Sequence, residues 1–89
     1  MISVNMVDAN VYQVVLEGSE ESVYRVSMGQ AFYRQLSGGL NTHEWVLVHA
    51  FRLILERDGR AELNPIFDLS ELARAYPDFV KEMQRRLGN

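Results

Sequence analysis

One long apolar segment, NTHEWVLVHAFRLILERDG at 41–59, constrains the fold of this chain more than any other feature. Asn41 can cap a helix by accepting a hydrogen bond from a first-turn amide, and Glu44 can reach back to the N–H of Asn41, as in a capping box. Gly59 can adopt the left-handed conformation that ends a helix. The segment therefore predicts a central helix over residues 41–58.

The apolar side chains of this helix cover a wide arc. A stripe at spacings of three and four residues is flanked by a second row: Leu47, Val48, Phe51, Ile54 and Leu55 form the stripe, and Val46, Ala50 and Leu53 form the row. The stripe must face a core, where each large side chain contributes roughly 1.5–3 kcal/mol on burial. The second row indicates that the helix is covered on another side as well, either by the C-terminal segment or by another subunit.

The chain has 89 residues, a length typical of one domain. Nine basic and twelve acidic side chains give a net charge of −3, so no overall positive field attracts nucleic acid. Cysteine is absent, which excludes disulfides, thiolate nucleophiles and cysteine-based metal sites. Residues 1–12 lack the features of a signal peptide, and no run reaches the roughly 18 apolar residues of a membrane span. We therefore expect a cytoplasmic protein without a membrane role.

Apolar and polar residues alternate in the N-terminal part of the chain, as they do in strands. Residues 1–7 fit a short strand, and residues 11–17 and 23–28 fit a β-hairpin joined through Gly18. One face of the hairpin is apolar, with Tyr12, Val14 and Leu16 from one segment and Tyr24, Val26 and Met28 from the other. We expect this face to pack on the central helix and the opposite, mixed face to remain uncovered.

Residues 29–36 have apolar side chains at helical spacing, with Ser27 as a candidate N-cap. A short helix is the preferred interpretation, and a third hairpin strand is the alternative. Gly38 and Gly39 then allow the turn into the central helix, as a C-cap and loop or as a hinge.

The chain after the central helix predicts two short helices. Pro65 prevents a helix from continuing, and the next two residues, Ile66 and Phe67, are expected to return to the core. Asp68 and Glu71 form a second capping box at the start of the first short helix. The last helix follows Pro77 and ends at Gly88, with Phe79, Val80, Met83 and Leu87 on its apolar side.

The run IFDLSELARAYPDF at 66–79 begins with an aromatic–Asp–Leu group and ends with tyrosine, proline, an acidic residue and phenylalanine. It resembles the C-terminal end of some small uncharacterised bacterial proteins that begin with a hairpin. The similarity covers this segment in sequence and the rest of the chain only in layout. Those proteins carry no assigned activity, so the resemblance implies a bacterial-type conserved domain and no site residues.

No pattern in the sequence points to a catalytic or cofactor site. His43 and His49 are six residues apart, about 240° around a helix, whereas two histidines that share one zinc ion lie four apart. We interpret His43 as a surface residue and His49 as a partly packed one. The carboxylates of the hairpin loop are interpreted as solvated, and no serine lies in a nucleophile elbow. We expect no metal and no cofactor.

The sequence thus predicts an α+β fold in which an antiparallel meander of two or three strands packs on the central helix and two short helices follow. The leading hypothesis for function is a non-enzymatic protein-interaction or regulatory module that pairs with itself or another protein through the central helix. Its candidate interface consists of Trp45, Val46, Ala50 and Leu53. Trp is a frequent anchor at protein interfaces.

Two alternatives belong to other functional classes. One is a regulator associated with DNA or RNA that presents a basic patch, Arg74, Lys81, Arg85 and Arg86. It predicts binding that weakens steeply with salt. The other is a small-ligand or hydrolytic function in a pocket between the sheet and the central helix, which would recruit His49 or Glu44.

Overall fold

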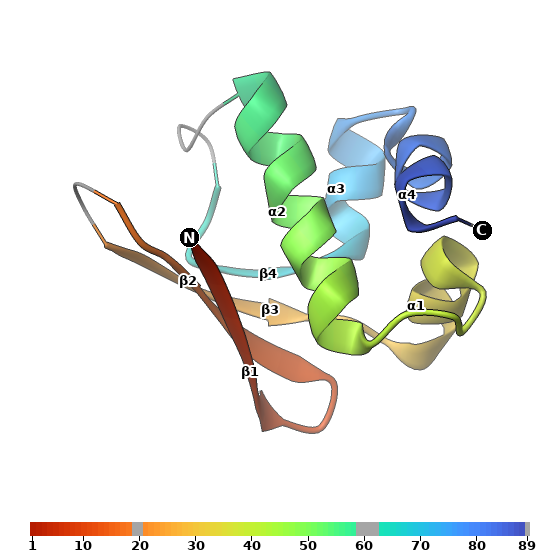
Figure 1. Cartoon of the computed structure of the whole chain (residues 1–89). Coiled ribbons are helices and arrows are strands. Elements are labelled where there is room, and N and C mark those ends of the chain that lie inside the picture. Colours follow the sequence, from red (N-terminus) through yellow and green to blue (C-terminus); the bar gives the residue numbers. More distant parts are fainter. Residues whose placement is uncertain (19–20, 59–62, 89) are drawn as a thin grey trace.

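The structure, a computed structural model, describes residues 1–18, 21–58 and 63–88. It has the predicted α+β architecture, with helices packed on one face of a four-stranded sheet (Figure 1). The elements in chain order are β1 Ile2–Asp8, β2 Val11–Leu16, β3 Ser22–Ser27, α1 Gln30–Ser37, α2 His43–Asp58, β4 Ile66–Asp68, α3 Ser70–Ala75 and α4 Phe79–Leu87. The strand order across the sheet is β1-β2-β3-β4.

The first three strands form the predicted antiparallel meander. Ile2 pairs with Leu16 between β1 and β2, and Tyr12 pairs with Val26 between β2 and β3. The register of β1 shifts just before Asp8, and Asn10 takes the left-handed conformation in the following turn, with φ 59°. The predicted strand at the N-terminus and the predicted hairpin are both confirmed.

The fourth strand, β4, is not predicted from the sequence. It runs parallel to β3, where the N–H of Arg25 donates to the carbonyl of Pro65 (2.7 Å) and the N–H of Leu69 donates to the carbonyl of Ser27 (2.8 Å). The expectation that both apolar residues of this segment return to the core is wrong for Ile66, which is 71% exposed, whereas Phe67 is buried. Alternate residues of a strand point to opposite faces, so only one of the two can face the helices.

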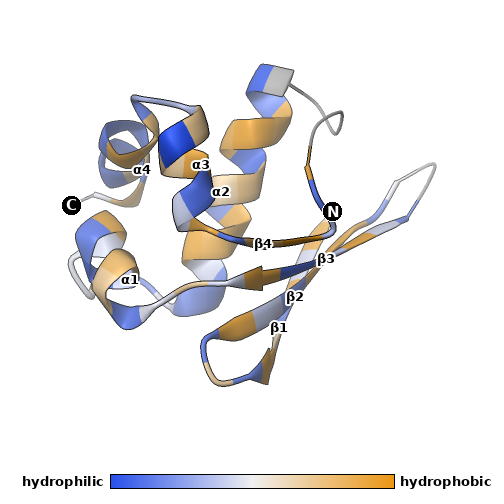
Figure 2. Cartoon of the chain, turned by 180° about the vertical axis from the view of Figure 1, so that it is seen from behind, coloured by the Kyte–Doolittle hydropathy of each residue, from blue (hydrophilic) through white to orange (hydrophobic). Residues whose placement is uncertain are grey.

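The core lies between the sheet and the helices. The buried strand residues are the predicted ones, and Phe51 of α2 contacts Tyr24 and Phe67, with ring centroids 5.5 and 6.2 Å apart. α4 and α1 also pack against α2, and α4 contributes the buried Phe79 and Met83. Hydrophobic residues accordingly run along most of α2 (Figure 2). The wide apolar arc of this helix is therefore covered by other elements of the same chain.

The helix starts differ from the predicted ones in two places. Thr42, not Asn41, caps α2, because its Oγ1 accepts the N–H of Trp45 (3.1 Å). The hydroxyl of Ser27 donates to Asp68 (2.6 Å) and does not cap α1, which begins after Gly29. The predicted helix end at residue 59 lies outside the described residues.

The other predicted helix signals are confirmed. α1 is a helix, not a third hairpin strand, and ends at Gly38 with φ 64°. At α3, the carboxylate of Glu71 accepts the N–H of Asp68 (2.9 Å), and the carboxylate of Asp68 accepts the N–H of Ser70 (3.1 Å). α4 ends at Gly88 in the left-handed conformation, with φ 77°.

Candidate interaction surfaces

Three of the four residues predicted for an interface on α2 lie in the core. Val46, Ala50 and Leu53 are buried, whereas the Trp45 side chain is 45% exposed. These three side chains present no surface to a partner of the folded chain, because the second apolar row of α2 packs inside it. The candidate interface on this helix is thereby reduced to Trp45 and its exposed neighbours.

Trp45 is held by two side chains on the same exposed face of α2. The ring of His49 meets the indole edge-on, with centroids 4.6 Å apart, and the guanidinium carbon of Arg52 lies 5.8 Å from the ring centroid. Spacings of four and seven residues place all three on one side of the helix. Burial, with smaller contributions from Arg52 and Arg86, lowers the pKa of His49 and so favours its neutral imidazole.

His43 belongs to a different aromatic cluster. Its ring stacks on Tyr33, with centroids 3.8 Å apart, and its Nε2 lies 3.2 Å from Oε1 of Gln30. It is therefore half-buried rather than a plain surface residue. Within residues 1–18, 21–58 and 63–88, no three side chains of His, Asp or Glu gather in the way that metal ligands do.

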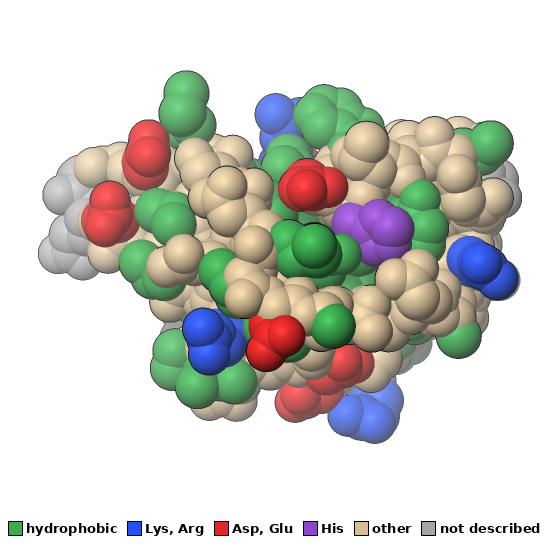
Figure 3. Space-filling model, turned by 90° about the horizontal axis from the view of Figure 1, so that it is seen from below, with side chains coloured by type: hydrophobic (Ala, Val, Ile, Leu, Met, Phe, Trp, Pro, Cys, Tyr) green, Lys and Arg blue, Asp and Glu red, His purple; other side chains and the backbone are tan. Residues whose placement is uncertain are grey.

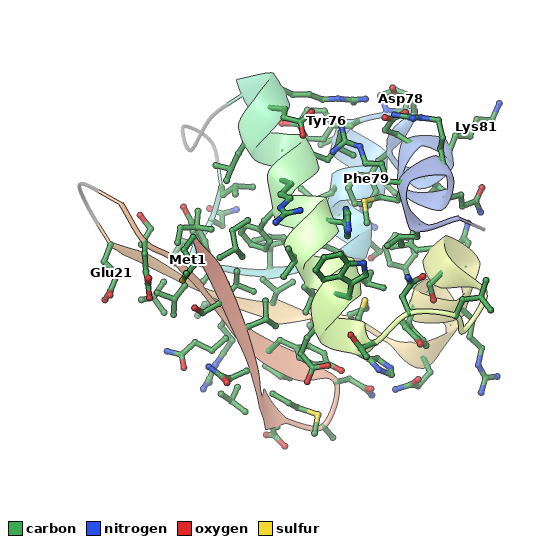
Figure 4. The ribbon with its side chains drawn as sticks, viewed as in Figure 1. Met1, Glu21, Tyr76, Asp78, Phe79 and Lys81 are labelled. Atoms are coloured by element: carbon green, nitrogen blue, oxygen red, sulfur yellow. The ribbon has the colours of Figure 1, made fainter. Side chains whose placement is uncertain are left out.

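The basic patch is compensated by acidic neighbours at two of its four positions. Arg86 binds Glu56 with both terminal guanidinium nitrogens (2.8 and 2.9 Å), and its Nε lies 3.2 Å from Glu82. Arg85 also pairs with Glu82, and these two arginines lower the pKa of Glu82 to about 2. Arg74 on α3 and Lys81 at the outer side of α4 are exposed (Figure 4). The positive field at this end of the chain is therefore weaker than the sequence indicates.

Two shallow depressions lie where β4 meets its neighbours. One is lined by Val11, Arg25, Ser27, Ile66, Phe67, Asp68 and Glu71, and the other by Leu63, Asn64, Phe67, Glu71, Leu72 and Ala75. Neither contains His49 or Glu44, the residues expected to serve a ligand or hydrolytic site. Burial acts to raise the pKa of Asp68, but hydrogen bonds from Ser27 and Ser70 outweigh it and keep that pKa below its usual value.

The outer face of the sheet is mixed, as predicted. Val23 and Arg25 of β3 are exposed there, and Val11 and Val15 of β2 are half-buried. Seen from below, the molecule shows hydrophobic, charged and other polar side chains interspersed, without one dominant patch (Figure 3). This face therefore carries exposed apolar side chains, Ile66 and Val23 among them, interspersed with charged ones.

The backbone of β1 forms an open edge of the sheet. The N–H of Glu17 donates to the carbonyl of Met1 (2.9 Å), so Met1 and Glu17 are a hydrogen-bonded pair in the antiparallel ladder. Such pairs alternate along a strand, so Ser3 and Asn5 also bond to β2. The N–H and C=O groups of the residues between them, Ile2, Val4 and Met6, point away from β2.

No strand pairs with this side of β1 in the described part of the chain (Figure 1). The segment from Ile2 to Val7 also contains no charged residue and no proline. Met6, which pairs with Tyr12 of β2 and projects to the same face as the core residues of the strand, is 62% exposed. β1 therefore combines unpaired backbone groups with an accessible apolar side chain.

The comparisons with known proteins yield no relative of this chain, since no family model, curated protein or solved structure matches it. None of the described helices is both long and apolar enough to cross a membrane.

Proposed function

We propose that this chain is a non-enzymatic protein-interaction module that binds a partner through the exposed side of α2 around Trp45. The observation that carries the proposal is an exposed indole held between Arg52 and His49. Trp and Arg are the residue types that most often dominate binding energy at protein interfaces. The cytoplasmic location expected from the sequence is part of this proposal.

The arrangement around Trp45 reduces the cost of binding. A cation–π contact contributes about 0.5–1 kcal/mol at an exposed site, and together with the His49 ring it restricts the indole before a partner arrives. A side chain that is already ordered loses less entropy on association. The partner that fits this surface places an apolar side chain on the indole and a carboxylate near Arg52.

The observations favour neither of the two alternative functions. Nucleic-acid binding requires cations that are available to phosphates, and Arg85 and Arg86 are engaged with Glu82 and Glu56. A ligand or hydrolytic site at His49 gains no support from the two depressions at β4, since neither is lined by His49, whose ring packs on Trp45.

The test uses the fact that the sequence contains one tryptophan. Proteins retained by the immobilised chain are compared among the native chain, Trp45→Ala and the control Leu40→Ala, which removes an apolar side chain that is 72% exposed elsewhere. We expect a partner that the native chain and the control retain and Trp45→Ala loses. Addition of that purified partner shifts the tryptophan emission to shorter wavelength, because the indole leaves water.

Trp45→Ala changes the free energy of unfolding by less than about 1 kcal/mol, because the side chain lies outside the core. Loss of binding in this variant is therefore not a consequence of unfolding. Retention of the same proteins by Trp45→Ala, or an unchanged emission spectrum in the complex, contradicts the proposal.

A further inference from the structure

We propose that two copies of this chain pair through the open edges of β1 to form one continuous eight-stranded sheet, with Val4 of each copy at the two-fold axis. This inference goes beyond the proposed function, because it uses a different surface and a different partner. The occupant of the edge is a second copy of the chain, and the Trp45 surface of each copy stays accessible.

The backbone of β1 selects this register. When Val4 lies opposite Val4 of the second copy, Ile2 lies opposite Met6 in both directions. Each of these residues directs its N–H and C=O outward, so every outward donor faces an outward acceptor in an antiparallel pair. If the register between the two β1 strands shifts by one residue, the outward N–H and C=O groups of one copy face groups of the other copy that already bond to β2. A larger shift leaves one of the three residues unmatched or places it against the irregularity next to Asp8.

The side chains of β1 are self-complementary in the same register. On the face that carries the core, Ile2 lies beside Met6 of the second copy, which covers an apolar side chain that is 62% exposed in the single chain. On the opposite face, Ser3 lies beside Asn5. Apolar side chains therefore lie beside apolar ones, and polar side chains beside polar ones. No charged side chain faces its counterpart in the second copy, because the strand is uncharged from Ile2 to Val7.

The edge lacks the features by which monomeric proteins avoid such pairing. Natural edge strands are commonly short, or carry lysine, proline or a bulge that disrupts pairing. β1 has seven residues, and its irregularity lies between Met6 and Asp8, beyond the segment that pairs. A symmetric pair also closes on itself, so both β1 edges disappear and no further copy can add through β1.

The junction also brings the two α2 helices to the same face of the joined sheet. The ion pairs of Glu56 with Arg86 of α4 and of Arg57 with Asp78, the residue before α4, mark one flank of α2. Val48 and Leu55 project to the opposite flank, and both are only half-buried in the single chain. Pairing through β1 places these two side chains beside the junction, where the second copy shields them from water.

The test is the molar mass in solution, measured by light scattering and sedimentation equilibrium on a chain whose carboxyl-terminal purification tag has been cleaved off. We expect the native chain to show twice the mass of the 10.2 kDa monomer at high concentration and to dissociate on dilution. Met6→Pro removes an outward N–H without removing a bond to β2, and we expect it to remain at 10.2 kDa. Met6→Leu, which retains the N–H and the apolar volume, dimerises like the native chain.

A second variant covers the case in which proline prevents folding. Met6→Lys retains every backbone group and places an ammonium opposite Ile2 of the second copy, so we expect a folded monomer with an unchanged circular dichroism spectrum. A native chain that is monomeric at the highest attainable concentration overturns the proposal, and so does a folded Met6→Lys or Met6→Pro chain that still dimerises. The tryptophan emission stays constant on dilution, whereas self-association through the Trp45 surface shifts it.

Discussion

The two edges of the sheet are built differently. β4 is three residues long, follows Pro65 and ends at Asp68, whose carboxylate accepts hydrogen bonds from Ser27 and Ser70. β1 is seven residues long and uncharged up to Val7. Shortness, proline and charge are ordinary protections against edge-to-edge association. The chain thus protects one edge of its sheet and leaves the other open, which is the arrangement expected of a protein that pairs through the open edge.

The two edge strands are also held in place by different interactions. β1 has a long ladder of backbone bonds to β2, with Ile2 and Val4 packed against the core. β4 has few ladder bonds and depends on the buried ring of Phe67 and on the contacts of Asp68. We therefore expect β4 to depend mainly on a buried side chain and β1 mainly on backbone hydrogen bonds. Substitutions that remove one or the other should distinguish the two edges.

The largest effect is expected at the anchor of β4. Phe67→Ala removes a buried ring that contacts Phe51, and we expect it to lower the free energy of unfolding by about 3–5 kcal/mol. Ile66→Ala, one residue earlier on the exposed face, changes it by no more than about 0.5 kcal/mol. Urea denaturation of both variants measures the difference. Similar losses in the two variants would show that β4 is not held by Phe67.

The backbone of β1 gives the next largest effect. Asn5→Pro removes an N–H that bonds to β2 and leaves a carbonyl of Gln13 without its donor, so we expect a loss of about 1–3 kcal/mol. Met6→Pro removes an N–H that points to the open edge. We expect it to lower the free energy of unfolding by less than Asn5→Pro does, when both variants are measured as monomers at high dilution. Equal losses would mean that the alternation of bonded and outward residues along β1 is incorrect.

The smallest expected effect concerns the cap at the end of β4. Asp68→Asn weakens the contacts with Ser27 and Ser70 and lowers the free energy of unfolding by about 1 kcal/mol at pH 7. Because the pKa of Asp68 in the folded chain lies below its unfolded value of about 3.9, its ionised form stabilises the fold above about pH 4. This contribution is lost as the pH falls through the folded pKa.

The stability difference between the native chain and Asp68→Asn should therefore be constant near neutral pH and shrink below about pH 4. Subtracting the two denaturation curves at each pH removes the contribution of the other carboxylates. A difference that grows on acidification would contradict the assigned hydrogen bonds.

Local signals were sufficient to predict the meander and the helices. Alternation of apolar residues in β2 and β3 defined their buried face, and the glycines after α1 and α4 defined the ends of those helices. The predicted cap of α2 was wrong, because Asn41 and Thr42 are both capable of capping and Thr42 takes that role. The choice depends on tertiary structure, since the hydroxyl of Tyr33 donates to the carbonyl of Asn41.

Non-local features were not predictable in the same way. β4 is three residues long and pairs in parallel with a strand 41 residues earlier, as in the Ser27–Asp68 pair, so it leaves no periodic signal of its own. The second apolar row of α2 required a choice between the C-terminal helices and another subunit. The leading hypothesis placed this row at an interface, whereas in the structure the row is buried within the chain and α1 and α4 pack against α2. Sequence alone does not place α4 beside α2. The open edge of β1 was not predictable either, because it depends on the order of the strands in the sheet.

Amide hydrogen exchange of β1, followed by NMR at high and at low protein concentration, tests the pairing most directly. In the dimer, the amides of Ile2, Val4 and Met6 bond to the second copy, whereas those of Ser3 and Asn5 bond to β2. We predict that dilution abolishes protection at the first three positions and retains it at the other two. Equal protection of all five amides at both concentrations, or none at Ile2, Val4 and Met6 in the concentrated sample, would contradict the proposed dimer.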